Sequence, residues 1–357
     1  MTFFLLSASS ILLALAQATT PPGPAAPAPS SPAAPAPSPS HAITPNDPKE
    51  RMELAKKVNG LLEMDIPWHL KATYEVLGDD GKSIDTGTYE EWRVSAKQYR
   101  IALHSQSISV EEYGGDHGTF RTGKQSWPGK PLSAIQTMIE RPIAPVAQPE
   151  KTELRNFERN FGSGNLPCTA LSVPSTKKPE DAESYCFDPV HAALLYASTP
   201  NRVFQTLFRE IVSIHDRYQA KDMQMFLQGR PWLKVHIDTI AALNSGDLQA
   251  LTVPADAIPV TARTREGGEA MRGRLVEKAV PAYPSTAKLQ GVQGTVVING
   301  IIGTNGHFRE LHVLSGPPML QQAALDAARQ WVYSPYLVDG QAVEVETDIN
   351  VVFVLAR

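Results

Sequence analysis

Residues 279–357 read AVPAYPSTAKLQGVQGTVVINGIIGTNGHFRELHVLSGPPMLQQAALDAARQWVYSPYLVDGQAVEVETDINVVFVLAR. Near the end of this stretch, every second residue from Val343 to Leu355 is apolar or Thr, and polar residues alternate with them from Glu344 to Asn350. A period of two predicts a strand with one buried face and one wet face. Asp339-Gly340 precedes the strand, and both residue types favour turns.

Two further strands and two helices are predicted upstream. Gly294–Ile302 and Phe308–Leu314 flank Asn305-Gly306, the strongest short hairpin signal. Apolar residues then recur at helical spacing after Pro317-Pro318, which fit only the first turn: Leu320, Ala323, Ala324, Ala327, Ala328 and Trp331. An earlier short helix starts at Pro284, with Ala287 and Leu289 turned inward. The order predicts a small α+β domain of two helices on a three-stranded antiparallel sheet.

An ordered set of residues makes this segment resemble the C-terminal domain of TonB-type energy transducers. The set is Pro281-x-Tyr283-Pro284, Ala287, Gly291, Gly294-x-Val296, Gly306, Val313, Ser315-Gly316, Ala324, Ala327, Trp331-x-Tyr333-x-Pro335 and Gly340. No single residue is specific, but their order and spacing are. The resemblance covers residues 279–357.

The resemblance implies that the domain binds the Ton box, a short N-terminal segment of outer-membrane receptors, as an added strand. Backbone groups of an exposed sheet edge supply the affinity in such binding. The last strand is the expected edge, and the approach to Tyr283-Pro284 is the second contact region. The expected partner-binding residues are Pro281, Tyr283, Pro284, Val345, Thr347, Ile349, Val351 and Phe353. Tyr283 could equally staple the helix start, and Trp331 and Tyr333 are expected in the core.

The N-terminus carries the features of an exported protein. Residues 1–18 are apolar from Phe3 to Ala16, too short to span a bilayer and typical of a signal peptide. An uncleaved membrane anchor is the alternative, because no Lys or Arg precedes Lys49. Residues 19–48 are rich in Pro, Ala and Ser, which predicts a disordered, extended linker. The expected location is the periplasm or cell envelope.

Residues 49–260 predict a β-rich periplasmic domain, and residues 261–278 a linker. A helix is expected at Glu50–Leu62, followed by many strands with helical stretches at Leu132–Ile139 and Lys151–Phe161. This order predicts a curved antiparallel sheet wrapped on a helix. The pattern resembles the half-barrel of periplasmic lipoprotein carriers such as LolA, through Tyr185-x-x-Asp188-Pro189 and Gly229-x-Pro231.

Cys168 and Cys186 are the only cysteines. They fall on neighbouring predicted strands, so an oxidising compartment predicts a structural disulfide. The redox alternative would require a C-x-x-C spacing.

The sequence offers no support for catalysis, a metal site or a cofactor. The nine histidines form no zinc motif, and no Walker loop or G-x-S-x-G stands in a plausible setting. The net charge of −4 carries no basic block of the kind that binds nucleic acid.

Two hypotheses follow from these features. In the first, an envelope transducer engages a TonB-dependent receptor and passes on force from an inner-membrane complex of the ExbB–ExbD kind. In the second, a soluble periplasmic binding or carrier protein uses the C-terminal domain only for docking. The fate of residues 1–18 and an apolar cavity within 49–260 would distinguish them.

Overall fold

The computed structural model describes residues 44–123, 130–146, 149–162, 164–172, 181–260, 263–266, 268–338 and 340–355. All of them belong to one compact unit of the chain. The predictions for residues 1–43, the export segment and most of the Pro-rich linker, lie outside the described residues. No helix in the described ranges is long and apolar enough to cross a membrane.

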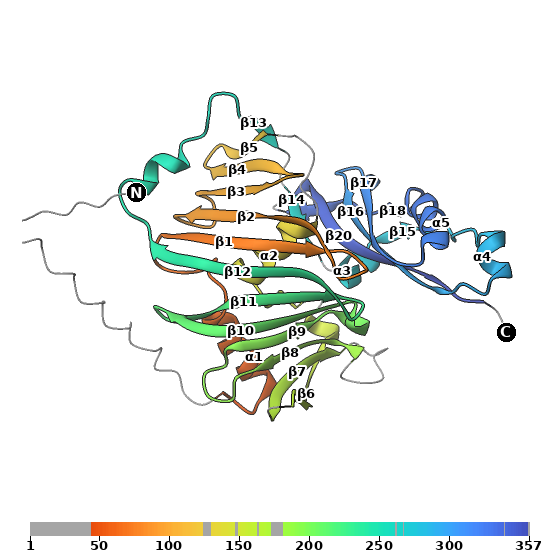
Figure 1. The fold of residues 1–357 in the computed structure, drawn as a ribbon, viewed down its shortest axis with the longest axis horizontal. Helices are drawn as coiled ribbons and strands as arrows, with labels where there is room; N and C mark the ends of the chain where they lie inside the picture. Colours follow the sequence, from red (N-terminus) through yellow and green to blue (C-terminus); the bar gives the residue numbers. More distant parts are fainter. Residues whose placement is uncertain are drawn as a thin grey trace, which may run out of the picture. The chain divides into compact units, whose positions relative to one another are not determined.

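The first large element is a thirteen-stranded antiparallel sheet (Figure 1). Its strand order is β13-β5-β4-β3-β2-β1-β12-β11-β10-β9-β8-β7-β6. The bounds are β1 Trp68–Leu77, β2 Ser83–Arg93, β3 Tyr99–Ser105, β4 Ser109–Gly115, β5 Gly118–Gly123, β6 Glu153–Asn160, β7 Asn165–Ser172, β8 Glu183–Phe187, β9 Leu194–Ser198, β10 Phe204–Ile214, β11 Arg217–Leu227, β12 Arg230–Ala242 and β13 Ile258–Val260.

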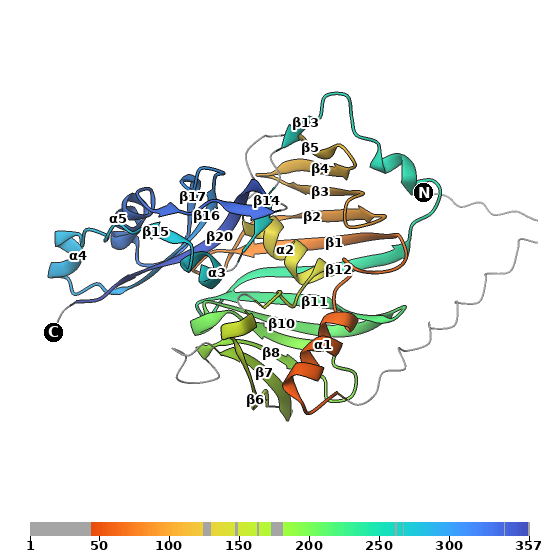
Figure 2. The ribbon, with the colours of Figure 1, turned by 180° about the vertical axis from the view of Figure 1, so that it is seen from behind.

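Helices α1 (Pro48–Val58) and α2 (Lys130–Glu140) pack on one face of this sheet (Figure 2). Asp47 caps α1 by accepting bonds from the N–H groups of Lys49 and Glu50. The apolar residues of α2 are buried against alternate residues of the central strands, such as Leu70 and Leu233. The predicted fold class, a curved antiparallel sheet with few helices, is confirmed.

One predicted helix in this region is wrong. Leu154, Phe157 and Phe161 recur at helical spacing, but residues 153–160 form the edge strand β6, paired with β7 along its whole length. Pairing with β7 decides the conformation, and the alternating charged residues blunt the free edge. Short 3-10 turns occur at Pro149–Lys151 (η1), Pro200–Arg202 (η3) and Asp247–Leu251 (η4).

The C-terminal part contains the predicted antiparallel core of β16 (Gly294–Ile302), β17 (Phe308–Ser315) and β20 (Gln341–Phe353). Two strands are added to it, so that the sheet has five rather than three. These are β14 (Arg263–Arg265), parallel to β20, and β19 (Tyr336–Val338), antiparallel to it. A separate pair is formed by β15 (Leu275–Glu277) and β18 (Val332–Tyr333).

Helices α3 (Gly268–Arg272), α4 (Ser285–Leu289) and α5 (Pro318–Ala328) contribute Met271, Ala287 and the apolar side of α5 to the core of this part. Ala287 is buried as predicted, but Leu289 is 88% exposed, because two residues that are two positions apart on a helix point to nearly opposite sides. The segment 261–278, expected to be a linker, contains β14, α3 and β15.

Candidate functional site

The strand β20 was expected to offer a free edge, and only its second half does. β16 pairs along one side of β20, from Gly294 opposite Phe353 to Ile302 opposite Val345. The first half of β20 has further partners, with β19 beside Gln341–Val343 and β14 beside Glu344–Glu346. From Thr347 to Phe353, β16 is the only strand paired with β20 within the described ranges. Unpaired backbone groups on such an edge can accept an added strand.

Most of the side chains expected to contact a partner point into the domain core. Five of them are buried on one face of β20: Val345, Thr347, Ile349, Val351 and Phe353. A partner on this edge would therefore meet backbone groups and the two exposed side chains, Asn350 and Val352, of which Val352 is 59% exposed. Asn350 and Val352 stand at even-numbered positions of the alternating strand, so the sequence pattern already indicates that they face away from the core.

The even-numbered residues from Glu344 to Asn350 were expected to be exposed to solvent, but the first two of these four are buried. Glu344 and Glu346 are 3% and 2% exposed. Glu344 forms ion pairs with Arg263 of β14 and Arg309 of β17, and Glu346 accepts a bond from the Asn299 amide. Neighbouring strands supply charged and amide groups to these carboxylates, so their burial is compensated by ion pairs and hydrogen bonds.

Tyr283 lies beside the end of β20. Its hydroxyl donates to the carbonyl of Val292 at 2.5 Å, and its ring packs edge-on against Phe353, with the centroids 5.5 Å apart. Pro284 is the N-cap residue of α4, and Pro281 is half-buried. The structure thus brings Tyr283 and Phe353 together, and these contacts support the stapling alternative for Tyr283.

Trp331 and Tyr333 lie in the core, as predicted. The indole N–H of Trp331 donates to the Ala279 carbonyl at 2.9 Å. The ring of Tyr333 meets Phe308 edge-on. Trp331 thus ties the start of the domain to the core, and Tyr333 packs against β17.

A groove of about 1120 Å³ follows the open half of β20. Its β20 side includes Asp348, Asn350 and Val352, and residues around the start of β10, such as Asn201 and Gln205, also line it. Asp348 is bound to Lys130 of α2, with 2.5 Å between Nζ and Oδ2. This volume exceeds that of a typical small-molecule pocket, so the groove has room for a short peptide segment.

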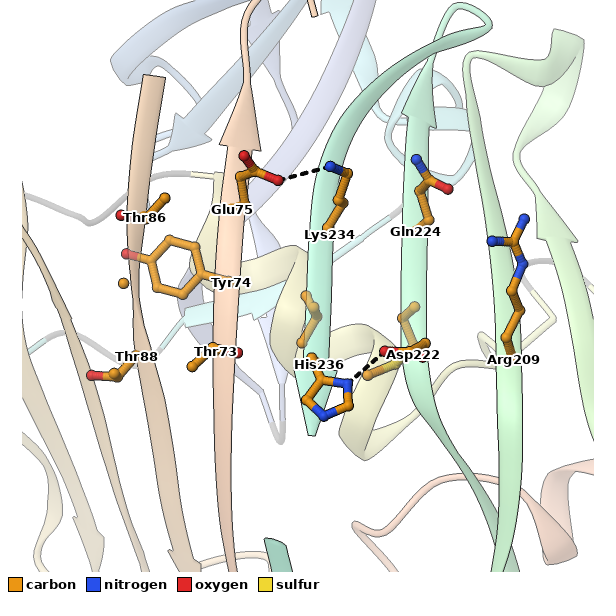
Figure 3. A pocket seen from close by; sticks show the side chains of 13 residues that line it. Thr73, Tyr74, Glu75, Thr86, Thr88, Arg209, Asp222, Gln224, Lys234 and His236 are labelled. Carbon is orange, nitrogen blue, oxygen red and sulfur yellow. Dashed lines mark hydrogen bonds and ion pairs between the residues drawn. The ribbon is translucent and has the colours of Figure 1, made fainter. Parts of the chain in front are cut away.

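A second hollow, of about 780 Å³, lies on the large sheet (Figure 3). One row across four strands holds Thr73, His236, Asp222 and Arg209, and His236 is 2.6 Å from Asp222. In the next row, Lys234 is 2.8 Å from Glu75. These opposite charges satisfy each other, which is typical of the solvated face of an antiparallel sheet. No group of His, Cys, Asp and Glu suited to a metal ion occurs among the described residues.

Cys168 and Cys186 form the predicted disulfide. They are directly opposite each other on β7 and β8. Tyr196 and partly buried residues such as Phe157 and Leu166 pack around them. The bond therefore ties neighbouring strands at one end of the large sheet.

A buried ionic network joins α2 to the large sheet. Arg93 of β2 lies 2.5 Å from Glu91 and 3.0 Å from Glu140 at the end of α2, and the Tyr89 hydroxyl donates to Glu91. Burial raises the pKa of Glu91 to about 7 against the attraction of Arg93, and the nearby Glu140 adds to the rise. Burial alone would lower the pKa of Arg93, but the two carboxylates outweigh it and raise this pKa.

Residues 279–355 match the family described as Gram-negative bacterial TonB protein C-terminal. The predicted identity of this segment is confirmed, and the family is not one of enzymes. Protein TonB of Vibrio cholerae serotype O1 (strain ATCC 39315 / El Tor Inaba N16961) is 35% identical over 77 residues. That match covers 21% of this chain and 32% of the Vibrio protein, so the chain spans about a third of the length of this relative.

Two solved structures are among those similar to this chain. A putative outer membrane lipoprotein-sorting protein domain from Vibrio parahaemolyticus has a TM-score of 0.38 at 10% identity, covering 56% of this chain and 96% of its own. A LolA superfamily protein from Nitrosomonas europaea has a TM-score of 0.39 at 7% identity, covering 58% and 97%. The expected resemblance of residues 49–260 is confirmed, and at these TM-scores it carries no argument about function.

Proposed function

We propose that this protein is a TonB-like component of the cell envelope whose C-terminal domain binds outer-membrane receptors by strand addition. The open half of β20, Thr347–Phe353, carries this proposal together with the family match of residues 279–355. The partner is the Ton box of a TonB-dependent receptor. Its backbone would pair with β20, and its side chains would contact Asn350, Val352 and Tyr283.

The proposal extends to energy coupling. The chain would pass force from an inner-membrane complex of the ExbB–ExbD kind to the receptor. This step requires that the protein remain attached to the inner membrane through residues 1–18. A catalytic role and a cofactor form no part of the proposed function.

Peptide binding tests the strand-addition step. The purified chain should bind synthetic Ton-box peptides, and proline should disrupt binding when it removes an outward N–H donor from β20. Neighbouring residues of a strand direct their N–H groups to opposite sides, so Asn350→Pro and Val351→Pro form a matched pair. We expect one variant to fold and lose binding, and the other to lose a bond to β16. If both variants fold and bind like the unsubstituted chain, this edge is not the binding site.

The N-terminal mass of the protein from its native envelope fraction tests the coupling step. A membrane-bound chain that begins at Met1 supports the transducer. A free periplasmic chain that begins near Gln17 or Thr19 excludes direct force transmission. It would leave the alternative of a soluble binding or carrier protein with a docking domain.

A further inference from the structure

The segment just before the C-terminal domain lies on the strand edge that a partner would use. We call residues 263–266 and 268–272 the arm; they include β14 and α3. Arg263, Thr264 and Arg265 pair in parallel with Glu344, Val345 and Glu346 of β20. The N–H of Glu266 extends this pairing by donating to the Glu346 carbonyl at 3.1 Å. The arm thus pairs with the backbone of β20 on the side opposite β16.

Side-chain contacts hold the arm at this register. The Arg263 guanidinium is 2.8 Å from the buried Glu344 carboxylate. The Tyr336 hydroxyl donates to Glu266 at 2.5 Å. Met271, at the far end, is 1% exposed within the core that contains Phe353.

The arm ends its pairing where the open edge begins. At Gly268, the first residue of α3, an added Cβ would lie 2.4 Å from the carbonyl oxygen of Asp348. Only glycine permits the arm to approach β20 this closely. Beyond Asp348, the groove residues Ile349, Asn350 and Val352 follow.

We propose that the arm is an internal competitor for the partner strand on β20. With the arm docked, Gly268 lies against the Asp348 carbonyl, so a partner can pair only with the residues beyond it, Ile349–Phe353. With the arm released, the ladder available to a partner extends back through Glu344–Glu346. This inference rests on the proposed function, because it assigns a regulator to the same edge.

Population arithmetic gives the size of the effect. A partner that needs the released state binds with an apparent affinity reduced by the fraction of molecules in that state. If the arm is docked in about nine molecules of ten, binding is weakened about tenfold.

Gly268→Ala, made in the full chain, is the releasing variant. The matched control is Gly115→Ala, where an added Cβ meets no atom within 4 Å. Amide exchange of residues 263–266 reports arm docking without any partner, and titration with synthetic Ton-box peptides reports binding. We expect faster exchange and about tenfold tighter binding for Gly268→Ala, with no change in Gly115→Ala. Faster exchange without tighter binding, while the unsubstituted chain binds, overturns the inference and leaves the proposed function standing.

Cross-linking the arm to β20 tests the opposite effect, a weaker binding of peptides. Arg263 and Glu344 are opposite each other in the parallel pair, so Arg263→Cys with Glu344→Cys allows a cross-link. The control is the double Ser variant at the same positions. The cross-link holds the arm docked in every molecule, so this chain should bind peptides at least about tenfold more weakly than the control. Equal binding by both overturns the competitor, and absence of binding by every form, Gly268→Ala included, overturns the proposed function with it.

Discussion

Replacing Arg93 by Met should destabilise the large sheet more than replacing the arginine of an exposed ion pair. Arg93 is the cation between Glu91 and Glu140, and the Glu91 side chain is 0% exposed. Removing one partner of a buried ion pair leaves an uncompensated charge, which costs about 3–5 kcal/mol. In a domain of this size, each kcal/mol lowers the melting temperature by roughly 2–4 °C, so the loss should be roughly 6–20 °C.

The matched control is Arg155→Met. Arg155 also pairs with a glutamate two residues earlier on a strand, Glu153, at 2.6 Å, but both side chains are exposed to solvent. Because solvent screens exposed charges, such a pair contributes almost nothing to the free energy of unfolding. Thermal and urea unfolding of both variants, followed by circular dichroism, is the assay. An Arg93→Met variant as stable as Arg155→Met would refute the assignment of a buried ion pair.

Stability should also depend on pH through Glu91. The pKa of this carboxyl is about 7 in the folded chain, against an ordinary value of 4.5. Between these two values the folded state holds a proton that the unfolded state has lost, so stability falls as pH rises through this window. The shift corresponds to a loss of about 3 kcal/mol, complete above pH about 7.

Glu91→Gln isolates this contribution, because an amide does not titrate. The difference in unfolding free energy between the two chains should change by about 3 kcal/mol from pH 4.5 to 7. A constant difference across this range would show that Glu91 ionises normally in the folded chain. In Arg93→Met, the loss of the cation should raise the pKa of Glu91 further and extend the pH dependence upward.

Two further predictions concern the disulfide and the staple. Intact mass with and without reductant should differ by two hydrogen atoms for Cys168–Cys186, and replacing both residues by Ser should cost about 3 kcal/mol in the chain-entropy model. Equal masses would contradict the bond. Tyr283→Phe removes only the hydroxyl bond to Val292 and should cost about 1 kcal/mol, with peptide binding unchanged, since the packing on Phe353 remains. A loss of peptide binding in this variant would show that the Tyr283 hydroxyl, and not only its ring, contacts the peptide.

Local pattern was sufficient for much of the C-terminal domain. The alternation on β20, the Asn305-Gly306 turn and the helical spacing from Leu320 to Ala328 each depend on neighbours in the chain. They predicted the three central strands, the α5 helix and the core positions of Trp331 and Tyr333. The spacing of the two cysteines likewise predicted their bond.

Tertiary structure alone decided which strand edges of those elements are left unpaired and which of their side chains are buried. The sequence determined that β20 is a strand with Val351 and Phe353 inward, because a strand's side-chain period is local. It did not determine that Glu344 is buried or that β14 covers the adjacent backbone, because both depend on residues some 80 positions upstream, at Arg263. The same holds for β6, whose helical spacing yields to pairing with β7. Backbone hydrogen bonds between distant segments decide edges, and an edge is what a partner strand would bind.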